Sequence, residues 1–578
     1  MRLWKRVNKV LTGKQKKMMI VMYLMMLLGA GLETIGTSLI LPFITVAMNP
    51  DSVLKNKYLR SIYDYFHMTS INSFLIMIVV VLIAVYVVKN IYLYFMYYAQ
   101  YRFVYNGQFN TSRNLFKDFV KRPYEFYLDA STPVVIRNIC SDVNGVYNLI
   151  LTYLQLFTEL IIFAALIVLS FIVSPTMTLL MCIFLGAVLL INKRVFGPIL
   201  RRFGNEVQTN NALVTKWLMQ AMNGMKETKV LNKEKYFVDQ YEDSAGKLNM
   251  IQRKQSSMSN IPRLTIETVC MCGILGMVGI FLSAGNNISD MIGKVAVLAM
   301  VAIRIMPSAN RITQAVNNIA YYEPSLDAVE NIIVHSHEIK ADQLYVNDIN
   351  ASPIPFHNEV KLDNITYRYP NTDVNILENT TLTIPRGKSI GLRGPSGAGK
   401  STAVDILLGL LEPQQGKVTV DGTDIADDLP GWYAEIGYVP QMMFMLDDTI
   451  RNNVAYGVAA DRIDDEKVWH ALKEAQMDEY IRGLPEGLDT SIGERGVRIS
   501  GGQRQRIGIA RALYNDPEIM IFDEATSALD NDTEAAIMEA IERLHGRKTL
   551  IIVAHRLTTI EKCDSIYEVS DKRFNRLR

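Results

Sequence analysis

The stretch Gly394-Pro-Ser-Gly-Ala-Gly-Lys400-Ser401-Thr402 decides the fold of the C-terminal part of the chain. It fits the pattern G-x-x-x-x-G-K-S/T, in which glycines let successive backbone N–H groups converge on phosphate oxygens that a Cβ would obstruct. A short apolar strand precedes it and a helix follows it, so a helix N-terminus also faces the anion. The pattern predicts a nucleotide-binding loop; a glycine-rich turn with a chance lysine is the alternative.

Within this loop, Lys400 is expected on the outer phosphates and Ser401 on Mg²⁺. The residues expected around ATP are Gly394, Ser396, Gly397, Ala398, Gly399, Lys400, Ser401 and Thr402.

Two carboxylates follow a second buried strand, residues 518–522. This places Asp523 and Glu524 at the C-terminal edge of a parallel sheet, where open α/β folds bind ligands. Asp523 is suited to the Mg²⁺ shell, and Glu524 to orienting an attacking water. An acidic pair at a strand end is commonly just solvated, but the phosphate loop favours a nucleotide hydrolase.

Together these segments resemble the nucleotide-binding domain of an ABC transporter, from about Phe356 to the C-terminus. The resemblance implies that Tyr369 stacks on adenine, that Gln441 links Mg²⁺ to the membrane domain, and that His555 contacts the γ-phosphate. Lys400, Glu524 and His555 would then be the catalytic residues, with ATP and Mg²⁺ as cofactors. Taken alone, His555 suits a surface histidine and Tyr369 a packed aromatic.

The resemblance also implies a second copy of the chain. Ser500-Gly-Gly-Gln503 resembles the signature motif and Ser527-Ala-Leu-Asp530 the D-loop, with Ile499 where leucine is usual. In this family the signature motif of one copy caps the nucleotide held by the other. The residues expected to contact ATP in trans are Ser500, Gly501, Gly502, Gln503 and Asp530. A homodimer with two competent sites is the simplest assembly, and a heterodimer is the alternative.

The first half of the chain is expected to cross a membrane. The composition is 49% hydrophobic with mean hydropathy +0.12, yet 20% of the residues are charged, which suggests a soluble domain joined to a membrane domain. Apolar runs long enough for the roughly 30 Å hydrocarbon core predict six spans. These are about 18–48, 72–99, 146–173, 177–198, 262–284 and 290–315, with Ser174-Pro175 dividing the third run.

We therefore expect an all-α six-helix transmembrane domain (1–335), a linker (336–355) and an α/β P-loop nucleotide-binding domain (356–578) with a parallel-sheet ATPase core and a helical signature subdomain. Lysine and arginine concentrate in the N-terminus and in the loops 100–143 and 193–263, which makes both termini cytoplasmic. The tips of these loops, near 128–135 and 222–231, resemble coupling helices that dock on the nucleotide-binding domains; solvated charged loops are the alternative.

Three arginines are substrate candidates. Arg304 lies in the sixth predicted span, where an arginine costs about 2.5 to 3.5 kcal/mol near the bilayer centre. Arg311 lies seven residues on, on the same helix face, and Arg263 opens the fifth span. Together they could receive an anionic head group. The alternative is that Arg304 pairs with an acid such as Glu267, and that the other two are simply solvated.

Scattered segments resemble bacterial flippases of lipid-linked oligosaccharides. They include 32–45, an outer amphipathic segment 57–66 that could lie beside lipid or pack on the protein, and 561–567. Such substrates carry a pyrophosphate, which agrees with the arginines. We expect a homodimer in a bacterial cytoplasmic membrane that flips such a lipid by ATP-driven alternating access.

Other functions remain open at this stage. The alternatives are a multidrug or peptide exporter and an ATP-gated channel or regulator. The intact Glu524 and His555 argue against the channel or regulator, because such proteins need not turn over ATP rapidly. The net charge of +2 gives no reason to expect nucleic acid, and the five cysteines lack the spacing of metal ligands.

Overall fold

A computed structural model describes residues 2–578 except 49–60, 62, 68–69, 174, 284–287, 337–350, 525–530 and 555. Inside helices, the side chains of residues 2, 37–48, 172–173, 176–177, 180, 184, 274, 277–278, 280–282, 288–304, 334–336, 531–533, 536 and 557–558 also lie outside the description. The chain divides into two compact units. One comprises Met1–Val120 with Ala130–Ile339, and the other comprises Lys121–Asp129 with Lys340–Arg578.

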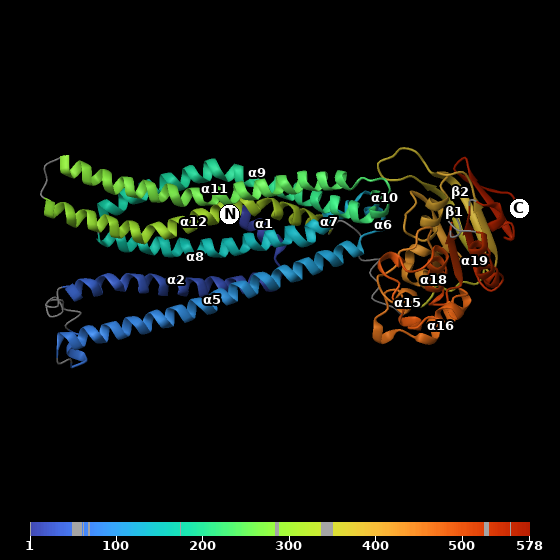
Figure 1. Ribbon diagram of the computed structural model, residues 1–578, viewed down its shortest axis with the longest axis horizontal. Coiled ribbons are helices and arrows are strands. Elements are labelled where there is room, and N and C mark those ends of the chain that lie inside the picture. The colour runs from blue at the N-terminus through green and yellow to red at the C-terminus, as the bar shows by residue number, and fades with distance from the viewer. Residues whose placement is uncertain are drawn as a thin grey trace. The chain divides into compact units, whose positions relative to one another are not determined.

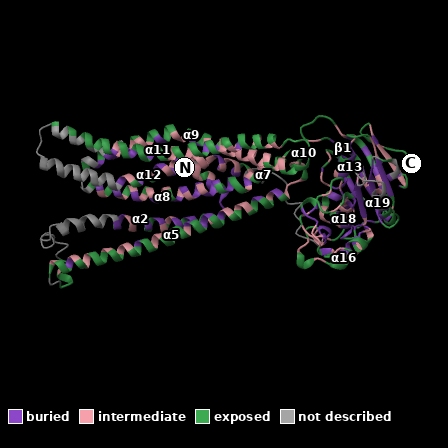
Figure 2. Cartoon of the chain, viewed as in Figure 1, coloured by how far each residue is buried: buried purple, intermediate pink, exposed green. Residues whose placement is uncertain are grey.

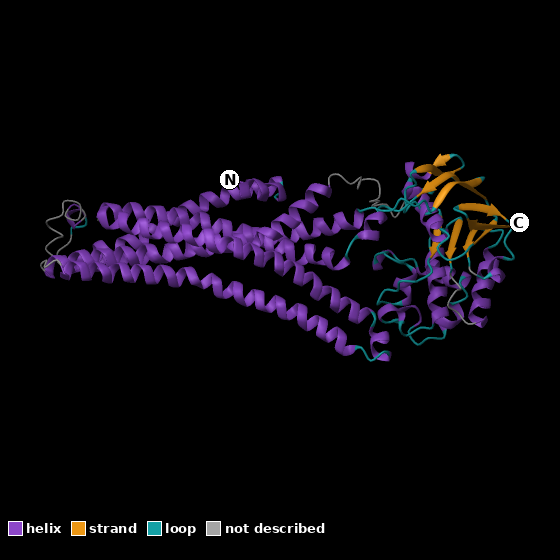
Figure 3. Cartoon of the chain, turned by 90° about the horizontal axis from the view of Figure 1, so that it is seen from above, coloured by secondary structure: helices purple, strands orange, loops and turns teal. Residues whose placement is uncertain are grey.

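The first unit is helical, and its long helices lie side by side (Figures 1 and 3). They are α2 (Gly13–Met48), α5 (Ile71–Lys121), α8 (Val143–Val173), α9 (Pro175–Asn223), α11 (Glu234–Ser283) and α12 (Ile288–Ser336). Shorter elements are α1 (Arg2–Val10), α7 (Thr132–Arg137), the π-helix η1 (Asn138–Asp142) and α10 (Met225–Val230). The break between α8 and α9 confirms the predicted division at Ser174-Pro175.

Several helices are much longer than a bilayer requires. The 51 residues of α5 extend about 75 Å at 1.5 Å per residue, so the predicted continuation of this helix beyond the thickness of a bilayer is confirmed. In the described residues, four stretches have the length and composition of a span: Gly13–Gly36, Ile71–Lys121, Thr132–Phe171 and Met181–Asn223. The apolar ends of α11 and α12 include undescribed side chains, so the count of six spans stays a prediction.

Two apolar cores hold this bundle together. One joins α1, α2, α5, α8 and α12 through residues such as Val7, Met22 and Val146, and the other joins α2, α8, α9, α11 and α12 around Ile266 and Ile305. In contrast, α5 exposes much of its apolar surface, including Val80 and Val87 (Figure 2). Such a face suits hydrocarbon or another subunit rather than water.

The second unit contains two sheets (Figure 3). A four-stranded antiparallel sheet has the order β2-β1-β4-β5, and a six-stranded sheet has the order β10-β9-β3-β8-β7-β6. The strands are β1 (Glu359–Tyr367), β2 (Leu377–Pro385), β3 (Ser389–Arg393), β4 (Gln415–Val420), β5 (Thr423–Asp424), β6 (Ile436–Val439), β7 (Ile519–Asp523), β8 (Thr549–Val553), β9 (Ser565–Ser570) and β10 (Arg573–Arg576). All neighbours from β9 to β6 in the larger sheet are parallel, which confirms the predicted core. The antiparallel sheet was not predicted.

The helices of this unit cover both faces of the larger sheet. They are α6 (Tyr124–Asp129), α13 (Lys400–Leu407), α14 (Leu429–Ala434), α15 (Ile450–Val454), α16 (Asp465–Glu474), α17 (Asp478–Arg482), α18 (Gly501–Leu513), α19 (Asn531–Leu544) and α20 (Leu557–Ile560). Side chains of β7 alternate between two cores: Ile519 and Ile521 pack with β1–β4 and α13, whereas Met520 and Phe522 pack with α15–α19. The strand end at Asp523 therefore lies where these two cores meet.

Candidate functional site

The glycine-rich loop lies between β3 and α13, as the sequence pattern predicts. Gly394, Gly397 and Gly399 all have positive φ, of 156°, 79° and 101°, and Gly399 caps the N-terminus of α13. A Cβ on Gly399 would lie 2.9 Å from Ile376 Cγ2, so both the backbone conformation and the packing require glycine there. The Lys400 ammonium donates to the carbonyl oxygens of Gly394 (3.0 Å) and Pro395 (3.1 Å), which keeps it under the loop.

The Asp523 carboxylate is suited to a cation. Asp523 is only 7% exposed, and its Oδ1 is buried without a hydrogen-bond partner in the part of the chain that the structure describes. Burial, followed by the nearby charge of Glu524, raises the pKa of Asp523, and the Lys400 ammonium opposes this shift. A divalent cation would supply the missing partner for Oδ1, and the exposed Ser401 hydroxyl follows Lys400 in the same helix turn. These residues fit a Mg²⁺ ion bound with a nucleotide.

Glu524 is held in a constrained backbone conformation directly after β7. Its φ is +50°, a region that non-glycine residues seldom adopt, and its N–H donates to Val553 O at 3.0 Å. Its Oε2 accepts a hydrogen bond of 2.6 Å from Gln441 Nε2, which comes from the segment after β6. The structure thus brings Glu524 and Gln441 together from two parallel strands that are neighbours in the sheet.

Tyr369 also reaches this site. Its hydroxyl lies 3.0 Å from Thr402 Oγ1 in the first turn of α13, and its ring packs edge-on to Tyr367. The aromatic ring predicted to face adenine is therefore adjacent to the phosphate loop.

The short helix α6 packs on the same unit, near Tyr369. Asp129 Oδ2 accepts a hydrogen bond from Asn371 Nδ2 at 3.0 Å, and Glu125 accepts one from the backbone of Glu412. Burial raises the pKa of Glu125. This confirms the predicted docking of the first coupling segment, although the docked helix begins at Tyr124, four residues before the predicted tip. The second predicted tip forms α10, which belongs to the helical unit.

The signature residues Ser500 to Gln503 do not contribute to the phosphate loop of their own chain among the described residues. Ser500 caps α18: its hydroxyl accepts from Gln503 N at 3.2 Å, and Gln503 Oε1 accepts from Ser500 N at 2.8 Å. Ser500 and Gly501 are exposed, whereas Gly502 is buried. Among the described residues, no hydrogen bond or ion pair joins this turn to the loop from Gly394 to Thr402. Asp530 and His555 lie outside the described residues.

The membrane arginines differ in their surroundings. Arg311 Nε lies 2.6 Å from Glu159 Oε1 of α8, and the two side chains are 49% and 14% exposed. Arg311 is therefore paired with a partly buried acid, a pairing that was not predicted from the sequence. Arg263 is exposed on α11. Arg304 lies on α12, but its side chain is outside the description.

Two family descriptions match the chain in this same order. Residues 20–306 match "ABC transporter transmembrane region" and residues 377–527 match "ABC transporter". The chain belongs to the ABC transporter family. It has the exporter arrangement, with a helical membrane domain followed by an ATPase domain that binds ATP with Mg²⁺ and drives transport.

Curated relatives of this ABC transporter include flippases. A protein of Desulfotalea psychrophila named "ATP-dependent lipid A-core flippase" is 32% identical over 375 residues, which cover 65% of this chain and 64% of that protein. A protein of the same name from Shigella sonnei is 29% identical over 468 residues, covering 79% and 78%. A solved structure, "Structure of a bacterial Atm1-family ABC exporter with ATP bound", superposes with TM-score 0.73 at 22% identity, covering 97% of this chain and 94% of that one. That likeness supports the fold of the transporter.

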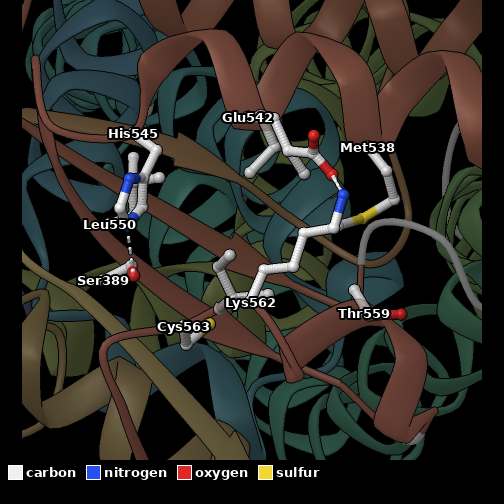
Figure 4. Close-up of a pocket in the computed structure, with 10 residues that line it drawn as sticks. Ser389, Met538, Glu542, His545, Leu550, Thr559, Lys562 and Cys563 are labelled. Carbon is white, nitrogen blue, oxygen red and sulfur yellow. Dashed lines mark hydrogen bonds and ion pairs between the residues drawn. The ribbon is translucent and has the colours of Figure 1, made fainter.

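A second polar cluster in the ATPase domain has a structural role. His545 Nε2 lies 3.0 Å from Ser389 Oγ, beside a pocket of about 220 Å³ (Figure 4). The same nitrogen lies 3.1 Å from Asp564 Oδ2. Because one ring nitrogen contacts both groups, the arrangement is not a nucleophile–base–acid relay. Burial would raise the pKa of Asp564, but hydrogen bonds from Ser389 and the Lys388 ammonium lower it to about 2. The cluster ties the start of β3 to the start of β9.

Sequence reasoning missed Asp405, which lies on α13 four residues after Ser401. Burial, followed by the charge of Asp523, raises the pKa of Asp405 to about 6. After burial, the charge of Asp405 also contributes to the raised pKa of Tyr438 in β6 and to that of Tyr124 in α6. The available signal was an isolated carboxylate in the otherwise apolar run from Thr402 to Leu411, at the spacing that shares a helix face with Ser401.

Proposed function

We propose that two copies of this transporter form a homodimer in a bacterial cytoplasmic membrane and use ATP to flip a lipid-linked oligosaccharide, a polyprenyl-pyrophosphate glycan, to the outer leaflet. The observation that carries the ATP-driven part is the buried Asp523 Oδ1, which has no hydrogen-bond partner among the described residues and lies near Lys400 and Glu524. The curated relatives named as lipid A-core flippases support a glycolipid rather than a soluble cargo.

Each part of the site would have a defined task. The loop N–H groups and Lys400 hold the phosphates, and Ser401, Gln441 and Asp523 hold Mg²⁺. The bound ion supplies positive charge to the transferred phosphoryl group. Glu524, fixed by its bond to Gln441, orients the attacking water, and His555 contacts the γ-phosphate.

Three features support assembly from two copies. Ser500 and Gly501 sit exposed at the N-terminus of α18, a position that suits an anion from another subunit. They have no bond to the phosphate loop of their own chain in the part that the structure describes. The apolar face of α5 is largely exposed as well. ATP held by Lys400 of one copy and Ser500 of the other would close the ATPase domains, and α6 would transmit that closure.

A mixed-dimer experiment tests the assembly. Chains with Lys400→Ala and chains with Ser500→Ala are each expected to be poorly active alone. Co-assembled, they form a dimer in which one site carries both defects and the other carries neither, so part of the activity returns. Activity that stays at the level of the separate variants would contradict the shared site.

The substrate is tested by ATPase measurements on the transporter in liposomes. We expect stimulation by a polyprenyl-pyrophosphate glycan, and Arg304→Ala is expected to reduce it. Stimulation by a lipid A-type glycolipid alone would assign the relatives' substrate class instead. Stimulation only by apolar drugs would assign the exporter alternative, a multidrug transporter.

A further inference from the structure

A groove of about 510 Å³ lies between the first turns of α2 and the middle of α5. From α2 it is lined by Lys14, Gln15 and Met18; the α5 lining includes Tyr98, Arg102, Asn106 and Asn110. These residues are distinct from the three arginines considered as substrate ligands, and all of them belong to the helical unit.

The floor of the groove is a fixed structure. Gln15 Oε1 accepts hydrogen bonds from the N–H and hydroxyl of Thr12, at 2.8 and 2.9 Å, and Gln15 Nε2 donates to Tyr147 Oη at 2.9 Å. A Cβ on Gly107 would lie 2.3 Å from Tyr147 Cε1 and 3.0 Å from Gln15 Nε2. The absence of a side chain at Gly107 thus allows α5 to approach this bonded pair, which is locked in place before any ligand binds.

The polar side chains above this floor have no partners. Within the described residues, Lys14 and Arg102 make no ion pair, and no hydrogen bond involves the side-chain amides of Asn106 and Asn110. Two other cations of the unit are neutralised: Arg6 by Glu330 at 2.6 Å, and Arg137 by Asp142 at 2.9 Å. Two unneutralised cations facing one groove repel each other and favour an anion between them.

The lining residues are ordered along the helices. Arg102, Asn106 and Asn110 are four residues apart and share one face of α5, while Lys14 and Met18 share a face of α2. The apolar run of α2 begins at Met18, so Lys14 precedes the hydrocarbon region. Gln15 lies against Gly107 of the antiparallel helix α5, so Lys14 lies more than one helical turn nearer the cytoplasm than Arg102. From the membrane toward the cytoplasm, the groove therefore presents Tyr98, then Arg102, then Asn106, and then Lys14 with Asn110.

That order matches one class of ligand. A lipid tail would lie against Tyr98, a phosphate between Arg102 and Lys14, and sugar hydroxyls beside Asn106 and Asn110. We propose that this groove captures the phosphate of a glycan-bearing lipid from the cytoplasmic leaflet, as the loading site of the transporter. The inference rests on the proposed function and adds where the substrate first binds.

The test uses the purified full-length dimer in phosphatidylcholine nanodiscs containing a polyprenyl-pyrophosphate glycan. Lys14→Gln with Arg102→Gln is expected to raise the half-saturating lipid concentration about 10- to 100-fold, because two charge-assisted hydrogen bonds are lost. Basal ATPase activity should not change. Native mass spectrometry should show one fewer bound lipid per protomer in the variant.

Two matched variants isolate the groove from general surface charge. Lys16→Gln with Lys17→Gln removes two exposed lysines of the same helix that do not line the groove, and it should bind lipid like the unchanged protein. Lys14→Arg with Arg102→Lys keeps both charges and should retain most binding. Equal lipid binding by the unchanged protein and the Lys14→Gln, Arg102→Gln variant would overturn the proposal, as would an equal loss in the Lys16, Lys17 control.

Two further measurements distinguish a lipid phosphate from a free anion, and a failure of this proposal from a failure of the proposed function. Soluble pyrophosphate at millimolar concentration should not displace the lipid; displacement would assign the groove to a free anion. If no lipid stimulates ATPase activity, the proposed function fails, whereas the mass-spectrometric comparison still decides whether the groove binds lipid phosphate.

Discussion

The nucleotide site of the ATPase domain and the helix bundle of the membrane domain differ in how their charged side chains are paired. At the nucleotide site, one buried oxygen of Asp523 has no hydrogen-bond partner within the described ranges. In the membrane domain, Arg311 is joined to Glu159, and Arg6 of α1 contacts Glu323, Asp327 and Glu330 of α12. The difference indicates that a buried charge left unpaired among the described residues suits a ligand, whereas a paired charge stabilises the fold.

The largest effect expected from this comparison follows Asp523→Asn. Mg²⁺-dependent hydrolysis should fall by about 1000-fold, because a metal ligand is lost. The melting temperature without nucleotide should stay the same or rise, since the ionised carboxylate is unfavourable where burial raises its pKa. Turnover and thermal unfolding measure the two effects, with the exposed Asp461→Asn as control. A large drop in melting temperature would contradict the comparison.

Glu524→Gln comes next. Hydrolysis should fall by about 100-fold or more, because the amide cannot serve as the base that orients water. ATP binding should persist, since Gln441 and the phosphate loop are unchanged. Equilibrium binding of ATP and single-turnover hydrolysis check this, and brisk hydrolysis would refute the role given to Glu524.

In the membrane domain, Arg311→Ala should lower stability by about 2 kcal/mol, because it leaves the largely buried Glu159 charge unpaired. The half-exposed arginine keeps the cost below that of a fully buried pair. Thermal unfolding in detergent measures it. Combining Arg311→Ala with Glu159→Gln should recover much of the loss; if the double variant is no more stable than Arg311→Ala, the pair has no stabilising role.

A smaller effect is expected at Asp564, a paired charge within the ATPase domain. Its pKa of about 2 lies below the unfolded value of about 3.9, so its contribution is present above pH 4 and is lost as pH falls toward 2. Asp564→Asn should cost about 1 kcal/mol near pH 7 after allowance for solvent screening. The difference in unfolding free energy between variant and unchanged protein should shrink below pH 4. A pH-independent difference would assign the effect to packing.

The smallest effect concerns α6. Asn371→Ala removes one exposed hydrogen bond to Asp129, worth about 0.5 kcal/mol, so stability should hardly change. The stimulation of ATPase activity by lipid should fall by about twofold while basal activity is kept. Asn358→Ala, whose side chain forms no hydrogen bond in the part that the structure describes, is the control. Unaltered stimulation in Asn371→Ala would show that this bond plays no part in coupling.

The contiguous motifs made the nucleotide site predictable. The loop from Gly394 to Thr402 and the strand before Asp523 carry their own chemistry within a few residues, because backbone N–H groups and strand ends are set locally. Short spacing also predicted the break at Pro175. The link between Gln441 and Glu524 needed the sheet order, which brings β6 beside β7 although 83 residues separate the two side chains.

The membrane domain was less predictable. Arg311 and Glu159 lie 152 positions apart, so spacing could not reveal that they pair, and the groove at Lys14 and Arg102 forms only where two helices meet around Gly107 and Tyr147. Asp405 was overlooked for a similar reason, since its raised pKa comes from burial and from Asp523 on another element.

By itself, the sequence determined that this protein combines a membrane-crossing helical domain with an ATPase of the ABC transporter family, because hydrophobic runs and glycine-rich loops act over short stretches of chain. Only the tertiary structure decided which charges are neutralised and which remain free for a ligand. That choice depends on contacts between distant helices and strands, where burial removes water and leaves each charge dependent on whichever neighbour the fold supplies.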